Sequence, residues 1–185
     1  MENRDGEVVD NQEVNPESTE KIREGLKYLT DVVEGKVTLQ EISGIKDEEI
    51  NAILGIGALM YQQGRWVEAE DLFRGAAMLN RKNAMAHSAL GTVLTAAGKY
   101  DEALDALSEA LKLDPTDIAA LVNRAEVFLK LTMFQEASDD LKKAIELDPN
   151  QTNPAANRAR AIVVGMSELI KELQKQIEQQ QSAEA

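Results

Sequence analysis

Residues that could carry acid–base or metal chemistry are few in this chain. His87 is the single histidine and cysteine is absent, so a zinc site or a thiolate nucleophile lacks its usual ligands. Two acidic pairs, Asp101-Glu102 and Asp139-Asp140, fall in helical sequence near lysines. We interpret both pairs as solvated charge, because no histidine or second carboxylate cluster accompanies them. The sequence therefore predicts a protein that is not an enzyme and holds no metal or cofactor.

Glycines give no phosphate-binding loop either. Gly55, Gly57 and Gly91 lie within apolar helical sequence, with no strand before them. We predict that they allow two helices to cross closely.

Three stretches of the chain repeat at a period of 34 residues. Small, aromatic, acidic and apolar residues recur in matching columns, and two copies close on Leu-Asp-Pro at 113–115 and 147–149. The columns are Gly57, Gly91, Ala125; Gly64, Gly98, Thr132; Trp66, Tyr100, Phe134; Glu68, Glu102, Glu136; Ala69, Ala103, Ala137; Phe73, Leu107, Leu141; and Ala76, Ala110, Ala144. This is the tetratricopeptide (TPR) pattern. It predicts an all-α fold, a solenoid of three helical hairpins.

The repeats divide the chain into five parts. We expect a disordered acidic tail at 1–17, an N-terminal helix with the segment leading into the repeats at 18–46, and the repeats at 47–151. A capping helix at 152–180 and a frayed tail at 181–185 follow. The repeats span about 50–83, 84–117 and 118–151, with first helices at 50–63, 84–97 and 118–131 and second helices at 66–80, 100–113 and 134–147.

Local signals refine these boundaries. Asp47 is a candidate N-cap for the first repeat, and residues 38–42 could form a short helical turn. Thr132 stands where the other repeats have glycine, which predicts a stiffer or slightly different turn. Asn153-Pro154 can start the last helix. Its apolar stripe consists of Ile162, Met166, Leu169, Leu173 and Ile177.

The concave face of such a solenoid is the candidate binding surface. In the TPR register, positions 2, 5, 6, 9, 12 and 13 of each first helix face it. The first repeat contributes Asn51, Leu54, Gly55, Ala58, Tyr61 and Gln62. The second contributes Met85, Ser88, Ala89, Thr92, Thr95 and Ala96, and the third Ala119, Val122, Asn123, Glu126, Leu129 and Lys130.

This predicted face is mostly small and apolar. Heat-shock co-chaperones of the same fold clamp a carboxylate with Lys, Asn and Arg at several of these positions, whereas here Asn123 alone is of a suitable type. A buried carboxylate without cations would be unpaired, at a cost of several kcal/mol. We therefore predict a protein partner that binds as an extended peptide with apolar anchors.

Composition excludes other partners. The 185 residues carry 33 acidic and 20 basic side chains, a net charge of −13, without a cluster of Lys and Arg. Nucleic acid and anionic membranes are therefore poor partners. The first residues contain no apolar signal core and no run is long enough to span a bilayer, so we expect a soluble, cytoplasmic protein.

Residues 34 to about 147 resemble the class II type III secretion chaperones, the SycD/LcrH-like group. The resemblance is carried by 35–42 (GKVTLQEI), 44–49 (GIKDEE), 61–66 (YQQGRW) and 69–73 (AEDLF), and by Ala125-Glu126 followed by Phe128-Leu129. It implies a chaperone that escorts translocator proteins and holds a Pro-x-Leu-x-x-Pro-like segment. The alternative from the repeats alone is a scaffold that joins subunits of a complex.

The N-terminal helix, expected from Thr19 to Glu34, has its own apolar stripe. Its members are Ile22, Leu26, Leu29 and Val33. The resemblance implies a homodimer formed through this stripe. The other interpretation is that the helix folds back on the first repeat.

Overall fold

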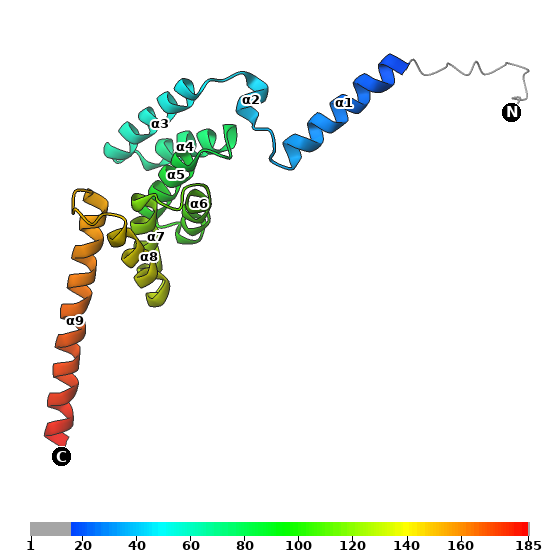
Figure 1. The fold of residues 1–185 in the computed structure, drawn as a ribbon. Coiled ribbons are helices and arrows are strands. Elements are labelled where there is room, and N and C mark those ends of the chain that lie inside the picture. The colour runs from blue at the N-terminus through cyan, green and yellow to red at the C-terminus, as the bar shows by residue number, and fades with distance from the viewer. Residues whose placement is uncertain (1–15, 185) are drawn as a thin grey trace, which may run out of the picture.

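The computed structural model describes residues 16–184, and every regular element in this range is an α-helix (Figure 1). The helices are α1 Pro16–Val33, α2 Leu39–Ser43, α3 Asp47–Gln62, α4 Trp66–Leu79, α5 Ala84–Ala96, α6 Tyr100–Leu113, α7 Ile118–Lys130, α8 Phe134–Glu146 and α9 Pro154–Glu184. The all-α prediction is confirmed. The tail expected at 1–17 lies almost entirely outside the described residues, and Pro16 and Glu17 already belong to α1.

Helices α3 to α8 form three hairpins that pack in sequence order. The alanine columns have no exposed surface, including Ala69, Ala103 and Ala137 near the start of each second helix. Small residues at these positions let the helices of a hairpin approach closely, and larger side chains such as Leu107 and Leu141 fill the remaining space. One continuous core therefore runs through the three repeats, as the 34-residue period predicted.

The turn inside each hairpin needs a left-handed residue. Gly64 and Gly98 have φ of 74°, and Thr132 has φ of 61°. The third turn therefore keeps the shape of the other two, and the different turn expected from the sequence is not found. A β-branched residue is strained in this region, since its Cβ approaches the following carbonyl oxygen.

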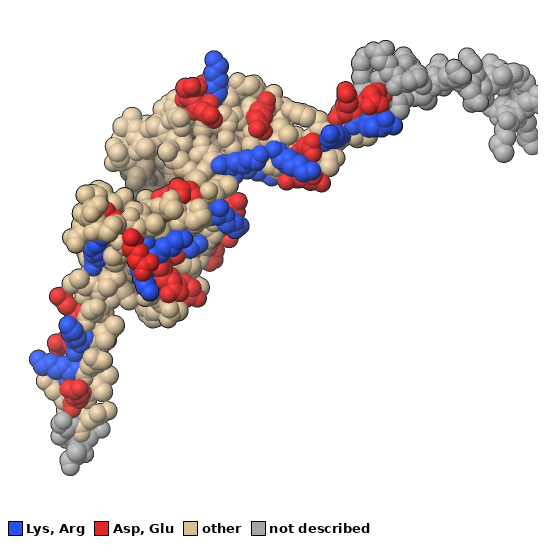
Figure 2. Space-filling view, in the orientation of Figure 1, with Lys and Arg blue, Asp and Glu red and all other residues tan. Residues whose placement is uncertain are grey.

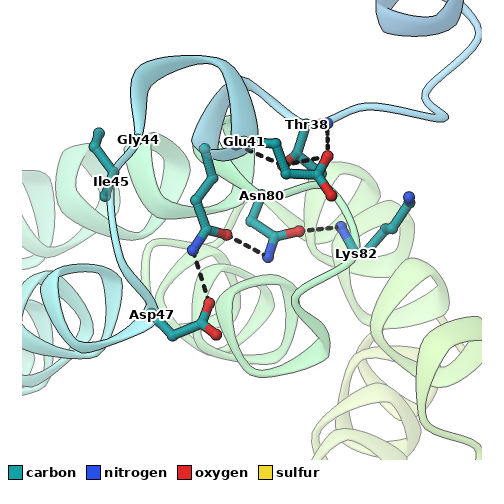
Figure 3. A pocket seen from close by; sticks show the side chains of 8 residues that line it. Thr38, Glu41, Gly44, Ile45, Asp47, Asn80 and Lys82 are labelled. Carbon is teal, nitrogen blue, oxygen red and sulfur yellow. Dashed lines mark hydrogen bonds between the residues drawn. The ribbon is translucent and has the colours of Figure 1, made fainter.

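The short helix α2 is fixed to the first repeat by a buried glutamine. Gln40 donates to Asp47 Oδ1 at 2.7 Å and accepts a hydrogen bond from Asn80 Nδ2 at 2.7 Å. Asp47 and Asn80 lie on either side of this bridge in Figure 3. Thr38 is the N-cap of α2, with its Oγ1 accepting from Glu41 N–H. The predicted helical turn at 38–42 is thus confirmed, with its bounds shifted by one residue to Leu39–Ser43.

Asp47 is not the N-cap of α3. Lys46 takes that place, and its N–H donates to the carboxylate of Glu49 at 2.9 Å. Asp47 is the first helical residue instead, so its side chain can receive Gln40. The carboxylate of Asp47 therefore accepts the hydrogen bond that joins α2 to α3 and does not cap α3.

The first part of α9 continues the solenoid. Asn153 Oδ1 accepts from Ala155 N–H and Ala156 N–H, and Ala156 and Ala159 are fully buried. This part contacts both α7 and α8. The helix then leaves the repeats and extends to Glu184, beyond residue 180, where the sequence suggested fraying (Figure 1).

Asp148 anchors the connection between α8 and α9. Arg160 Nη1 donates to its carboxylate at 3.0 Å, and the N–H groups of Thr152 and Asn153 donate at 3.0 and 3.2 Å. Burial disfavours the charged carboxylate, but these hydrogen bonds outweigh burial and hold the pKa of Asp148 below its usual value.

Helix α1 projects from the other end of the array (Figure 1). Leu26 and Val33 are 60% and 82% exposed. The helix therefore does not fold back on the first repeat, which was one of the two interpretations of its stripe. The side chains of Ile22 and Leu29 are outside the described residues. Between residues 16 and 184, none of the helices combines the length and apolarity needed to cross a membrane.

Candidate binding face

His87 and Asp140, which were considered for metal or acid–base chemistry, contact other residues of the fold. His87 Nε2 lies 3.0 Å from the carbonyl oxygen of Arg81. Asp140 is 6% exposed and receives both Nε and Nη2 of Arg124, at 2.7 and 2.8 Å, so its interpretation as solvated charge was wrong. Across the described part of the chain, no group of three histidine, aspartate or glutamate side chains could hold a metal ion.

The first helices α3, α5 and α7 contact one another and form one side of the array. The predicted binding residues on these helices differ in exposure according to their position in the helix. The fifth position is buried in every repeat: Leu54 is 6%, Ser88 9% and Val122 0% exposed. Leu54 and Val122 belong to the hydrophobic core, and Ser88 is a buried polar residue. Their assignment as exposed contact residues is corrected.

The other columns remain accessible. Position 2 is exposed in all three repeats, as Asn51, Met85 and Ala119. Positions 6, 9, 12 and 13 are exposed or half-buried, as Gly55, Ala58, Tyr61, Gln62; Ala89, Thr92, Thr95, Ala96; and Asn123, Glu126, Leu129, Lys130. Figure 2 shows an indentation between α3 and the beginning of α9 whose surroundings are mostly uncharged. The open columns are therefore largely uncharged, with Glu126 and Lys130 as the exceptions.

Helix α9 contacts this face at the third repeat. Arg158 Nε lies 2.9 Å from Glu126 Oε1, and Arg158 Nη2 donates to Asn123 Oδ1 at 2.5 Å. Asn123 in turn donates to Thr92 Oγ1 at 2.8 Å. A polar chain thus links α5, α7 and α9, and Asn123 and Glu126 are already engaged. Sequence reasoning missed Arg158, although an arginine one turn inside the capping helix was the available signal.

Two further cavities lie away from this face. One, of about 350 Å³, lies between α2 and the end of α4 and is lined by Gln40, Asp47 and Asn80 (Figure 3). Its polar groups bond to one another, as described above. The other, also about 350 Å³, lies between α4, α5 and α6, beside Arg74 and His87. Arg74 is paired there with Glu70 and Glu102.

Comparisons with known proteins agree with the geometry of the repeats. Family models described as "TPR repeat" and "Tetratricopeptide repeat" match residues 91–131 and 118–151. These residues cover the second half of α5 and all of α6, α7 and α8, which include buried alanine columns. No curated protein sequence matches the chain.

Solved structures share the fold over most of the chain. SycD, a type III secretion translocator chaperone of Yersinia enterocolitica, was solved as an alternative dimer. It is 25% identical over 70% of this chain and 97% of its own, with a TM-score of 0.61. PcrH in complex with the chaperone-binding region of PopB is 26% identical over 64% of this chain and 97% of its own, with a TM-score of 0.59. The first TPR of Spaghetti (RPAP3), bound to an HSP90 peptide, is 20% identical over 66% and 97%, with a TM-score of 0.58.

Proposed function

We propose that this tetratricopeptide-repeat protein is a non-catalytic chaperone that holds an extended segment of a secreted translocator protein on its concave face. The likeness to PcrH bound to a chaperone-binding region supports the class of client. The protein would act in the cytoplasm, before its client is exported. The parts at 18–46 and 152–180 would flank the three repeats and limit the binding face.

The neutral surface of repeats one and two carries this proposal. Asn51, Ala58 and Met85 are exposed there, and Tyr61 and Thr92 are half-buried. Small residues leave shallow pockets for apolar side chains, while the amide and hydroxyl groups can bond a peptide backbone. A proline-containing segment suits this surface, because it is already extended and loses little conformational entropy when it binds.

The surface does not suit a carboxylate. Arg158 is a cation at its edge, but it is paired with Glu126. Lys130 is exposed at position 13 of the third repeat, and the same position holds Gln62 and Ala96 in the others. Among the described side chains of this face, a peptide that ends in a carboxylate would therefore find no set of converging cations, unlike the ligand of a heat-shock co-chaperone.

Substitutions at exposed positions test the proposal. Ala58→Glu and Met85→Glu place a charge on the face without opening the core, whereas Leu54→Glu or Val122→Glu would disrupt packing. The probe is a fluorescently labelled synthetic peptide containing Pro-x-Leu-x-x-Pro, followed by anisotropy. Each substitution should weaken binding at least tenfold. Val67→Glu is the control, because Val67 is 73% exposed on a second helix.

If the two substitutions and the control bound the peptide with equal affinity, the binding site would lie elsewhere on the protein. Co-purification from the native host, followed by mass spectrometry, identifies the class of client. Hydrophobic secreted proteins support the chaperone, whereas stable subunits of one complex would support a scaffold.

A further inference from the structure

The second half of α9 presents an apolar stripe that nothing in the described chain covers. Val163, Leu169, Ile170, Leu173 and Ile177 are between 39% and 60% exposed. This part of the helix extends away from the repeats (Figure 1). A helix that lacks tertiary packing is only marginally stable in water, and exposed apolar side chains make that state less favourable. Burial of this stripe against a partner would therefore stabilise the second half of α9.

The stripe has the spacing of a coiled coil. Four of these residues, Val163, Ile170, Leu173 and Ile177, join half-buried Met166 in steps of 3, 4, 3 and 4 residues, which places the five at heptad positions a, d, a, d and a, with Leu169 at a flanking g position. The three a positions are all β-branched, and Leu173 occupies a d position. This combination favours two parallel strands over larger assemblies.

Charges on α9 are compatible with a copy of the same helix. From Val163 to Gln181 the charged residues lie at heptad positions b, c and f, namely Glu168, Lys171, Glu172, Lys175 and Glu178. The flanking e and g positions are uncharged: Ser167, Gln174 and Gln181, and Leu169 and Gln176. Figure 2 shows the charged side chains along one side of α9 and uncharged surface along the other.

Identical charges would therefore not face each other across a pairing of two α9 helices. This stretch carries a net charge of −1 (two lysines and three glutamates), although the whole chain carries −13. Repulsion between copies along this helix is therefore small compared with that between whole chains.

We propose that residues 163–181 of α9 pair with the same residues of a second copy as a parallel two-stranded coiled coil. The pairing covers the stripe and leaves the binding face of each copy open, since that face lies on the first helices of repeats one and two. Only five apolar layers are available, so the dimer is reversible and dissociates on dilution. Helix α1 is a less suitable surface, because its apolar stripe has four members and the helix contains Gly25.

Sedimentation of the full chain over a range of concentrations tests this pairing. The average mass should rise towards twice the monomer mass as concentration increases. Ile170→Glu with Leu173→Glu should keep the protein monomeric at every concentration. The control is Lys171→Ala with Lys175→Ala, which changes the net charge equally but on the opposite side of the helix, and should still dimerise. Unchanged circular dichroism in the double variants shows that the repeats remain folded.

A single cysteine reports the orientation, since the chain has none of its own. Gln180→Cys, at the next d position, should give a disulfide-linked dimer on oxidation, whereas Gln179→Cys, at a c position, should not. Three results would overturn the proposal: a wild-type protein that is monomeric throughout, a dimer that survives Ile170→Glu with Leu173→Glu but is lost on removal of residues 1–34, or loss of peptide binding in that variant without a change of mass.

Discussion

Gly57 of α3 lies so close to Phe73 of α4 that a Cβ at position 57 would be 2.5 Å from Cε1 of the ring. The next hairpin repeats the relationship, with a Cβ on Gly91 only 2.4 Å from Cγ of Leu107. In the third hairpin Ala125 occupies this column and is fully buried. In the first two hairpins the paired helices are therefore too close for a Cβ at this column, whereas the third hairpin accommodates the methyl group of Ala125.

Gly57→Ala should destabilise the protein, because the ring of Phe73 is buried and cannot move aside freely. Overpacking of this kind costs about 1–3 kcal/mol. Urea unfolding followed by circular dichroism gives the change in the free energy of unfolding.

Gly55→Ala is the matched control, two residues away on the same helix. Gly55 is exposed and nothing lies within 4 Å of a Cβ placed there, so it is not a helix-crossing glycine as the sequence suggested. This variant should be more stable by about 0.5–1 kcal/mol, because alanine favours helix. Equal effects of the two substitutions would show that the close contact with Phe73 has no energetic weight.

Thr132→Gly should stabilise the third hairpin. Thr132 has φ of 61°, a conformation that costs an L-residue about 1–2 kcal/mol and glycine much less. The reciprocal change, Gly98→Thr, should lower stability by a similar amount, since Gly98 has φ of 74°. Urea unfolding of both variants tests this, and a loss of stability in Thr132→Gly would contradict it.

Asp140→Ala should cost about 3 kcal/mol, because it leaves the guanidinium of Arg124 partly buried without its carboxylate. Asp139→Ala should have little effect, since Asp139 is exposed and accepts a hydrogen bond from Gln135 Nε2 at 3.1 Å on the same helix. Thermal unfolding of the two neighbouring variants makes the comparison. Similar melting temperatures would mean that the ion pair adds nothing to the stability of α7 and α8.

Asp148→Asn should lower the free energy of unfolding by an amount that depends on pH. The pKa of Asp148 is lower in the folded state, so its ionised form stabilises the fold above the unfolded pKa of about 4, and this contribution is lost as pH falls through the folded pKa. Unfolding measured from pH 7 to pH 3 should show the difference from wild type shrinking below about pH 4. Arg160→Met should reduce this pH dependence, and a constant difference would contradict the assignment.

Much of the fold could be predicted from the sequence because its signals are local. Gly64, Gly98 and two Leu-Asp-Pro endings place the helix boundaries of the repeats within about three residues of those observed. The end of α9 was harder, because the sequence after Gln179 is polar and contains no stop signal such as glycine or proline.

The binding face could be predicted only in part. Periodicity states which way a residue points but not how near the next helix lies, so Leu54 and Val122 were assigned to the surface although α5 and α9 follow in the array. The pairs Arg124–Asp140 and Arg158–Glu126 join helices 16 and 32 residues apart, and no local rule connects them.

Arg158 has one more consequence for a ligand. By pairing with Glu126 and Asn123, it holds α9 against the open surface at the third repeat. A polypeptide held on this face as proposed would have one end next to α9, so its two ends would not be equivalent.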